Sequence, residues 1–218
     1  MSLERLGRLR EGVYRLTGAG FSYPTADLLD AAAATVPALT DLGLYDYAFA
    51  LPVADAAAAL ADSELRDLET AHAALFEAGV GGAACSPHFT AYVADPGSGD
   101  VARVQAELRA AYRRFGIGDA IADGDMVDHV AIEMEVMARL CADEVRRRVD
   151  DDQPSIALSR QAEFISQYLA PWVPTFARRV TEVDGHRAYT SLAMAAHAIV
   201  EHERELIPLL LSTVGSES

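Results

Sequence analysis

The sequence predicts an all-α protein that folds as a bundle of about 8–10 helices. Apolar residues recur at helical spacing through most of the chain, whereas alternating, strand-like runs between turn residues are scarce. With 218 residues and 51% hydrophobic content, the chain is long enough to bury one sizeable core. We therefore expect residues 1–218 to form a single domain.

The first helix is expected over residues 3–18, because one apolar stripe runs along it and Gly18 and Gly20 then end it. The stripe consists of Leu6, Leu9, Val13 and Leu16. Thr25 is expected to cap a short second helix that ends near Pro37.

The middle of the chain is less regular. Residues 41–51 suggest a short helix or turn, and residues 63–78 carry a clearer helical stripe. Glycines and prolines over residues 81–99 predict an irregular loop with one possible turn of helix. Residues 101–115 are amphipathic and predict the next helix.

The C-terminal half contains the longest helical patterns. A helix is expected over residues 125–149, with Asp128 in a capping-box position near its start. Residues 155–169 predict another helix, and prolines separate it from a shorter one. The last helix is expected over residues 186–211, strained or bent where Pro208 removes an amide donor.

The charge of the chain is strongly acidic. It has 33 acidic and 18 basic residues, all of the latter arginine, for a net charge of −15. This composition indicates a surface that holds its hydration in concentrated salt, and it argues against nucleic acid as a partner. No run approaches the roughly 20 apolar residues of a membrane helix, and the N-terminus has no signal-like apolar region. We expect a cytoplasmic protein without membrane insertion, with Cys85 and Cys141 as apolar filler.

The sequence offers little for catalysis. It lacks phosphate-binding glycine loops, and the absence of lysine removes Schiff-base chemistry and lysine general bases. Cys85 and Ser86 lie near His88, but no orienting acid follows at a recognisable spacing. We therefore expect no catalytic residue and no cofactor.

Metal binding is also poorly supported. Only Glu69 and His72 fit the Glu-x-x-His spacing, of which a dinuclear bundle site needs two copies. Two further pairs could each supply two ligands from one helix face, which does not close a tetrahedral site. These pairs are His129 with Glu133 and His197 with Glu201. Ordinary polar contacts are favoured for them.

Asp125, Asp128 and His129 cluster at one predicted helix start, beside the irregular apolar stretch. They have two interpretations, which the residues alone leave open. In the structural one, the aspartates cap the helix and complement its dipole, and His129 is a partly buried imidazole. In the functional one, an aspartate and a histidine at the mouth of an apolar groove hold a guanidinium of a bound peptide.

Four segments, in order along the chain, carry a family resemblance. They are Tyr14-Arg-Leu with Phe21-Ser-Tyr-Pro24; Leu75-Phe76 with Ser86-Pro-His-Phe-Thr-Ala-Tyr92; Val127-Asp-His-Val-Ala-Ile-Glu-Met-Glu-Val-Met-Ala-Arg-Leu140; and Phe164 to Phe176 with Tyr168-Leu-Ala-Pro-Trp172. Together they resemble the TorD/DmsD/NarJ family of molybdoenzyme maturation chaperones. The third segment is the most specific, since it is similar to the family's Pro-Asp-His-x-x-x-Glu-x-x-x-Met-x-x-Leu.

The chain departs from that pattern at three positions. Val127 replaces a proline, His88 an aromatic residue and Phe89 a glutamate. The last two changes weigh against a polar role for the loop at residues 86–92. The matching positions that the resemblance carries over are Asp128, His129, Glu133, Met137, Pro87, Tyr92 and Trp172.

The resemblance implies a TorD-like helical fold and a chaperone that catalyses nothing itself. Its partner would be the catalytic subunit of a DMSO-reductase-type molybdoenzyme, bound through the subunit's twin-arginine leader peptide or its folded body before cofactor insertion and export. Asp128 and His129 would then lie in the leader-binding groove, with Leu75, Phe76 and Tyr92 as apolar walls, in a monomer or homodimer. Glu133, Pro87 and Trp172 complete the expected peptide-binding set.

Three alternatives remain at this stage. The nearest is a NarJ-like nitrate reductase assembly factor. A second, of another class, is a small helical metal-binding protein or enzyme in which distant ligands converge. Its candidate ligands are His129, Glu133, His197, Glu201 and His202. A third is a structural oligomerisation module.

Overall fold

The computed structural model describes residues 2–77, 82–95, 99–118, 121, 124, 126–150, 152–183 and 185–215. Within these residues the regular secondary structure is helical, apart from an isolated antiparallel bridge between His88 and His129. The predicted all-α class is therefore confirmed. None of the described helices is long and apolar enough to cross a membrane.

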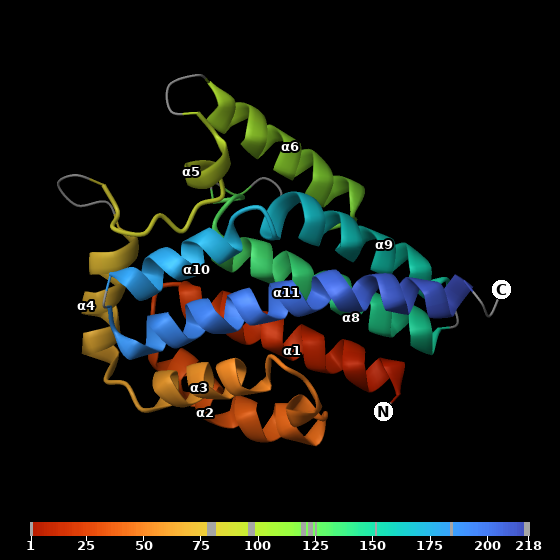
Figure 1. Cartoon of the computed structure of the whole chain (residues 1–218), viewed down its shortest axis with the longest axis horizontal. Coiled ribbons are helices and arrows are strands. Elements are labelled where there is room, and N and C mark those ends of the chain that lie inside the picture. Colours follow the sequence, from red (N-terminus) through yellow and green to blue (C-terminus); the bar gives the residue numbers. More distant parts are fainter. Residues whose placement is uncertain are drawn as a thin grey trace.

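The helices follow one another along the chain as labelled in Figure 1. They are α1 (Leu3–Phe21), α2 (Ala26–Asp41), η1 (Leu44–Asp46), α3 (Ala50–Ala61), α4 (Leu65–Phe76), α5 (Thr90–Val93), α6 (Asp100–Arg114), α8 (Val130–Val149), α9 (Pro154–Phe164), the π-helical turn η2 (Ile165–Leu169), α10 (Val173–Glu182) and α11 (Arg187–Gly215).

Three long helices form the centre of the molecule. Helix α1 packs along α8, and α11 packs against α3, α9 and α10. Helices α2 and α3 lie on one side of this centre, α4 lies at one end of it, and α5 and α6 lie on the side opposite α2 and α3 (Figure 1). Most of the buried apolar side chains belong to one contiguous core, which includes Trp172, Phe164 and Phe176.

The prediction that Gly18 and Gly20 end the first helix is wrong, because α1 continues to Phe21. Both glycines permit close packing instead. A Cβ on Gly18 would lie 3.1 Å from the carbonyl oxygen of Ala131 in α8, and one on Gly20 would lie 2.6 Å from Leu192 Cδ2 in α11. The absence of side chains here lets α1 approach its two neighbours.

Two other boundaries were wrong. Helix α2 begins after the expected Thr25 cap, but it passes through Pro37 and ends at Asp41. Helix α3 occupies residues that the sequence did not predict as helical beyond residue 51. Its alanine-rich sequence gives a weak apolar periodicity, because alanine fits both faces of a helix.

A buried ion-pair network connects four of the helices. The Arg10 guanidinium in α1 donates to both carboxylate oxygens of Glu203 in α11, at 2.7 and 2.6 Å. It also donates to Glu144 Oε2 in α8 at 2.7 Å and to the Gln161 side-chain oxygen in α9. All four side chains are buried. The network holds two carboxylates and one guanidinium, and Arg148 balances the remaining negative charge by donating a 2.8 Å hydrogen bond to Glu144.

We expect the substitution Arg10→Met to lower the free energy of unfolding by roughly 3–5 kcal/mol, because it leaves Glu203 buried without its partner and removes one of the two arginines that pair with Glu144. Urea denaturation followed by circular dichroism measures this change. Arg8→Met is the matched control, since Arg8 lies on the same helix and forms an exposed pair with Glu4; it should change stability little. Equal stability of the two variants would contradict the account.

Candidate functional site

Asp128 lies at the centre of a polar cluster that joins the segment around α5 to the start of α8. Its Oδ2 accepts a 2.6 Å hydrogen bond from the Thr90 hydroxyl. Its Oδ1 lies 3.3 Å from His88 Nδ1 and accepts a 3.2 Å hydrogen bond from the Gln105 side-chain amide. Both oxygens of this buried carboxylate are therefore engaged within the protein.

Backbone hydrogen bonds hold the same two segments together. The Phe89 amide donates to the Asp128 carbonyl at 2.8 Å, and the Val130 amide donates to the Pro87 carbonyl at 2.8 Å. The Tyr112 hydroxyl of α6 donates to the Val127 carbonyl at 2.7 Å. The loop at residues 86–92 is thus fixed against the beginning of α8.

The surroundings of Asp128 keep it ionised. Burial opposes ionisation, but hydrogen bonds from His88 and Thr90 outweigh burial and lower the pKa of this carboxyl. The carboxylate in turn orients the imidazole of His88. In the neutral tautomer that donates from Nδ1 to Asp128, the Nε2 of His88 remains an acceptor.

The predicted helix start at Asp125 is wrong, because His129 is the N-cap of α8. The helix starts at Val130, and His129 Nδ1 accepts a 3.1 Å hydrogen bond from the Ala131 amide. Asp128 does not occupy the predicted capping-box position, because its side chain turns away to Thr90. Asp125 itself lies outside the described residues. Burial lowers the pKa of His129 to about 4, so its ring is neutral at physiological pH.

Glu133 and Trp172 form a buried pair beneath this cluster. The Trp172 Nε1 of the segment before α10 donates to Glu133 Oε2 at 3.0 Å, whereas Glu133 Oε1 has no hydrogen-bond partner among the described residues. Burial raises the pKa of Glu133 well above its usual value. Both side chains are inaccessible to solvent, so they support the site from below.

The apolar residues expected as groove walls are mostly internal. Leu75, Phe76 and Pro87 are buried, and only Tyr92 is half-buried. The Phe76 ring packs edge-on against Tyr189, with ring centroids 5.1 Å apart. Tyr92 packs against Trp172 at 5.2 Å, and the Arg179 guanidinium lies 4.9 Å from the Tyr92 ring centroid. The structure therefore gathers these side chains in the core behind the loop rather than along an open groove.

A surface hollow lies directly beside the Asp128 cluster. The polar side chains of Ser86, His88 and Gln105 line it, together with apolar atoms of α5 and α6. Its apolar lining comes from Ala91, Ala94 and Val101. The His88 side chain is 37% exposed and Gln105 is half-buried, so these two members of the cluster are accessible from the hollow.

His88 is the functional candidate that the sequence did not reveal. The orienting acid that the sequence lacked near this histidine is Asp128, which lies 40 positions away. His88 precedes α5 and lies opposite the start of α8, which brings its side chain to Asp128. No local spacing in the sequence predicts this contact. The sequence weighs against a polar role for this loop, whereas the structure shows a polar contact between His88 and Asp128.

The converging metal site is not found. Within the described ranges, no group of three or more His, Cys, Asp or Glu side chains gathers closely enough to hold a metal ion. The His129 Nδ1 caps α8, and Glu133 accepts from Trp172. These contacts take the place of metal ligation at both positions.

The helical fold and the fixed Asp128 loop define an all-α protein with a surface hollow at the start of its central helix. The chain belongs to the nitrate reductase delta subunit family, whose model matches residues 43–178. That match includes both the loop at residues 86–92 and the segment around Asp128.

Three curated relatives are similar to the chain. A TorD chaperone of Vibrio cholerae serotype O1 is 34% identical over 86 residues, which is 38% of each chain. The selenate reductase assembly chaperone protein of Thauera selenatis is 31% identical over 138 residues, covering 63% of this chain and 68% of that protein. A TorD chaperone of Photobacterium profundum is 23% identical over 105 residues, 48% of each chain. The chain thus spans less than two fifths of the Vibrio cholerae relative's length. No solved structure matches the chain.

We expect the neutral His129 ring to make folding pH-dependent. Since its pKa falls from about 6.5 in the unfolded chain to about 4 in the fold, its contribution is complete above pH 6.5 and is lost as the pH falls towards 4. The loss should be on the order of 3 kcal/mol. Denaturant unfolding of the wild type and of His129→Asn across this range measures it as a change in their stability difference.

His186→Asn is the control that separates the loss of a helix-capping hydrogen bond from the effect of burying a neutral histidine ring. The His186 Nδ1 accepts from the Ala188 amide at 3.2 Å, an equivalent contact at the start of α11, but its ring is only half-buried. A stability difference between wild type and His129→Asn that stays constant from pH 7 to pH 4 would show that the His129 ring is not buried in its neutral form.

Proposed function

We propose that this protein is a cytoplasmic maturation chaperone that binds the catalytic subunit of a molybdoenzyme through that subunit's twin-arginine leader peptide. Binding would precede insertion of the molybdenum cofactor and export. The observation that carries the proposal is the family match over residues 43–178, which contains both segments that the Asp128 cluster joins. The relatives named chaperone protein TorD and selenate reductase assembly chaperone protein support it.

The site favours binding over catalysis. The Asp128 carboxylate is engaged on both oxygens, and His129 and Glu133 are buried in structural contacts. A general acid or base must reach the substrate to act on it. Since the relatives are named chaperones rather than enzymes, we propose that the chain has no enzymatic activity.

The accessible surface for a leader is the hollow beside His88. Gln105 and His88 offer polar contacts, and the alanines of α5 with Val101 offer apolar surface to an aliphatic side chain of the leader. Asp128 acts as a positioning residue here, because a guanidinium could reach it only by displacing one of its present partners. The net charge of −15 adds a long-range attraction for a cationic leader at low ionic strength, and concentrated salt screens it.

Six members of the expected peptide-binding set support this hollow from within. They are Leu75, Phe76, Pro87, Tyr92, Glu133 and Trp172. Their packing holds the loop at residues 86–92 in place against the core. We propose that they determine leader affinity through the shape of the loop. Any direct contact with the leader by the buried members of this group would require the loop to separate from the core.

A second candidate comes from the family description. A nitrate reductase assembly factor would bind a related catalytic subunit, and the matching family is named for a nitrate reductase delta subunit. The two candidates differ in what is bound. A leader-specific chaperone binds the isolated leader, whereas an assembly factor that recognises the body of its client binds the subunit after its leader has been removed.

The test is a calorimetric titration of the purified protein, in molar salt, with leader peptides of the molybdoenzymes encoded nearest its gene. We expect saturable binding to one leader, and a loss of roughly tenfold or more in Asp128→Ala, because the released loop no longer holds His88. Charge-driven binding would fade as salt rises, whereas apolar contacts persist or strengthen.

Asp55→Ala is the matched control, since Asp55 is an exposed aspartate on α3, away from α5 and α6 (Figure 1). It should bind the leader as the wild type does. Unchanged leader affinity in folded Asp128→Ala and His129→Ala would refute the assignment of this site. Binding of the leaderless subunit alone would favour the assembly factor.

A further inference from the structure

A second polar site lies in the C-terminal half of α8, away from the Asp128 cluster at its start. A surface hollow of about 350 Å³ is bounded there by α8, α9 and the turn at residues 115–118 that follows α6. Four arginines line it together with one carboxylate, that of Asp143. The arginines are Arg139, Arg146, Arg147 and Arg160. Arg139 is paired with Glu135 of its own helix at 2.8 Å, so the other three arginines are the ones available to a ligand in the hollow.

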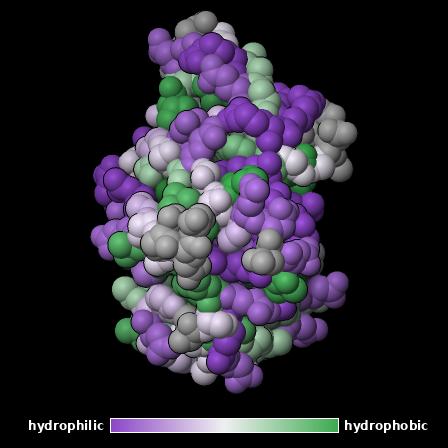
Figure 2. Space-filling view, turned by 90° about the vertical axis from the view of Figure 1, so that its right-hand side faces the viewer, coloured by the Kyte–Doolittle hydropathy of each residue, from purple (hydrophilic) through white to green (hydrophobic). Residues whose placement is uncertain are grey.

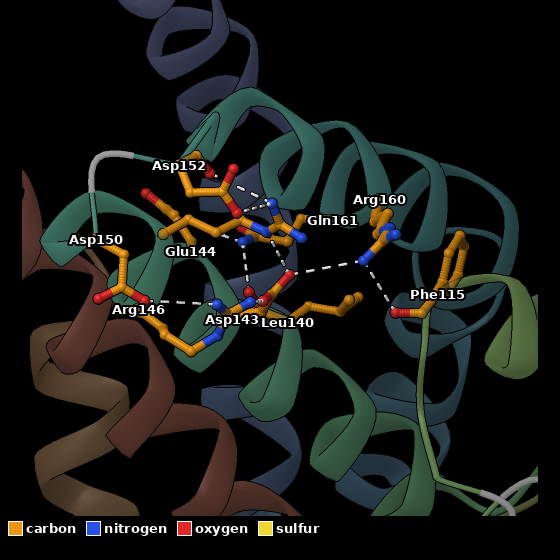
Figure 3. A network of polar contacts seen from close by, with 10 residues as sticks. Phe115, Leu140, Asp143, Glu144, Arg146, Asp150, Asp152, Arg160 and Gln161 are labelled. Carbon is orange, nitrogen blue, oxygen red and sulfur yellow. Dashed lines mark hydrogen bonds and ion pairs between the residues drawn. The ribbon is translucent and has the colours of Figure 1, made fainter.

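One carboxylate serves three of these guanidinium groups. Asp143 accepts hydrogen bonds from Arg146 and, at 2.9 Å, from Arg147 Nε. Arg160 Nη1 lies 3.6 Å from the same carboxylate. Figure 3 shows Asp143 between Arg146 and Arg160. Burial opposes ionisation of Asp143, but hydrogen bonds from Arg147 and Arg146 outweigh it and lower the pKa of this carboxyl.

The other acidic partners of Arg146 and Arg147 lie at the exposed rim. Asp150 pairs with Arg146 at 3.6 Å and Asp152 pairs with Arg147 at 3.0 Å, and their side chains are 57% and 56% exposed. Exposed ion pairs of this kind contribute little, because water and salt compete for both charges. A ligand anion can therefore displace them. The face of the molecule towards the ends of α8, α9 and α11 is largely hydrophilic, with small separate apolar spots (Figure 2).

Arg160 distinguishes this hollow from ordinary helix-surface pairing. It comes from α9, whereas the other three arginines come from α8. Its Nη1 donates to the Phe115 carbonyl at 3.1 Å, which holds the guanidinium in place across the hollow (Figure 3). By contrast, the exposed Arg178 pairs with Glu182 on its own helix. A guanidinium fixed by a backbone carbonyl keeps further N–H donors for a ligand.

We propose that this hollow binds a phosphate-type oxyanion, with Arg160 and Arg147 as its principal ligands. Guanidinium groups bind phosphate oxygens through paired, charge-assisted hydrogen bonds, and two helices supply such groups here. Leu140 and Ile117 also line the hollow, but both side chains are buried, so the guanidinium groups provide most of the contact with a ligand. The proposal is independent of leader binding, which uses the other end of α8.

The test is a calorimetric titration at neutral pH with inorganic phosphate and with phenyl phosphate, at an ionic strength held constant with chloride. We expect saturable binding of at least one of them, weakened roughly tenfold or more in Arg160→Gln. Tighter binding of phenyl phosphate would assign the site to a phosphate ester, and equal affinities to the free ion. Saturation by neither ligand, or undiminished binding to Arg160→Gln, would overturn the proposal.

Asp143→Asn provides a readout that misfolding cannot mimic. It removes the carboxylate that competes with the ligand, so we expect it to tighten phosphate binding by roughly tenfold. Weaker binding in a folded Asp143→Asn variant would also overturn the proposal. Arg178→Gln removes an exposed arginine on α10 and should leave the affinity unchanged.

Discussion

The buried guanidinium of Arg10 is the constraint on which the arrangement of the helices depends. An arginine remains charged at any accessible pH, so its burial requires acceptors in fixed positions. Glu144, Gln161 and Glu203 supply them from α8, α9 and α11. Apolar side chains can slide past one another at small cost, whereas these directed bonds allow one register. The network thus specifies how α1, α8, α9 and α11 align, whatever its net contribution to stability.

The register of α8 determines where both polar sites lie. The Asp128 cluster precedes the first turn of this helix, and the arginine hollow surrounds its last turns. Glu133 connects the first turns of α8 to Trp172, which begins the approach to α10. The loop at residues 86–92 therefore rests on a support that the core fixes on two sides. Affinity for a peptide benefits from such preorganisation, because less ordering is needed on binding.

The fold class and most helices could be predicted because their signals are local. Apolar stripes recur within one helix, and Thr25 caps α2 through contacts within a turn. The errors occur where tertiary contacts decide. Gly18 and Gly20 resemble a helix stop, yet α8 and α11 use them for close approach. Residues 125–129 resemble a capped helix start, yet Asp128 turns to Thr90 and leaves His129 as the cap. The partners of Arg10 lie 134 to 193 positions away, and no spacing in the sequence reveals them.

The contacts of Arg10 and Arg160 give a physical reason for the use of arginine in place of lysine. At Arg10 one side chain makes bonds to three partners, and at Arg160 one side chain links a backbone carbonyl to a shared carboxylate. A lysine ammonium offers three donors from a single atom and cannot span such partners. In concentrated salt, where a charge is screened within about 3 Å, directed short-range bonds retain more of their strength than diffuse attraction. An acidic surface, which holds water, and arginine side chains, which form directed hydrogen bonds, are therefore both suited to concentrated salt. The acidity of the chain then requires no cationic partner to explain it, and under the proposed function recognition of a client relies on the shape and polar contacts of the loop beside His88.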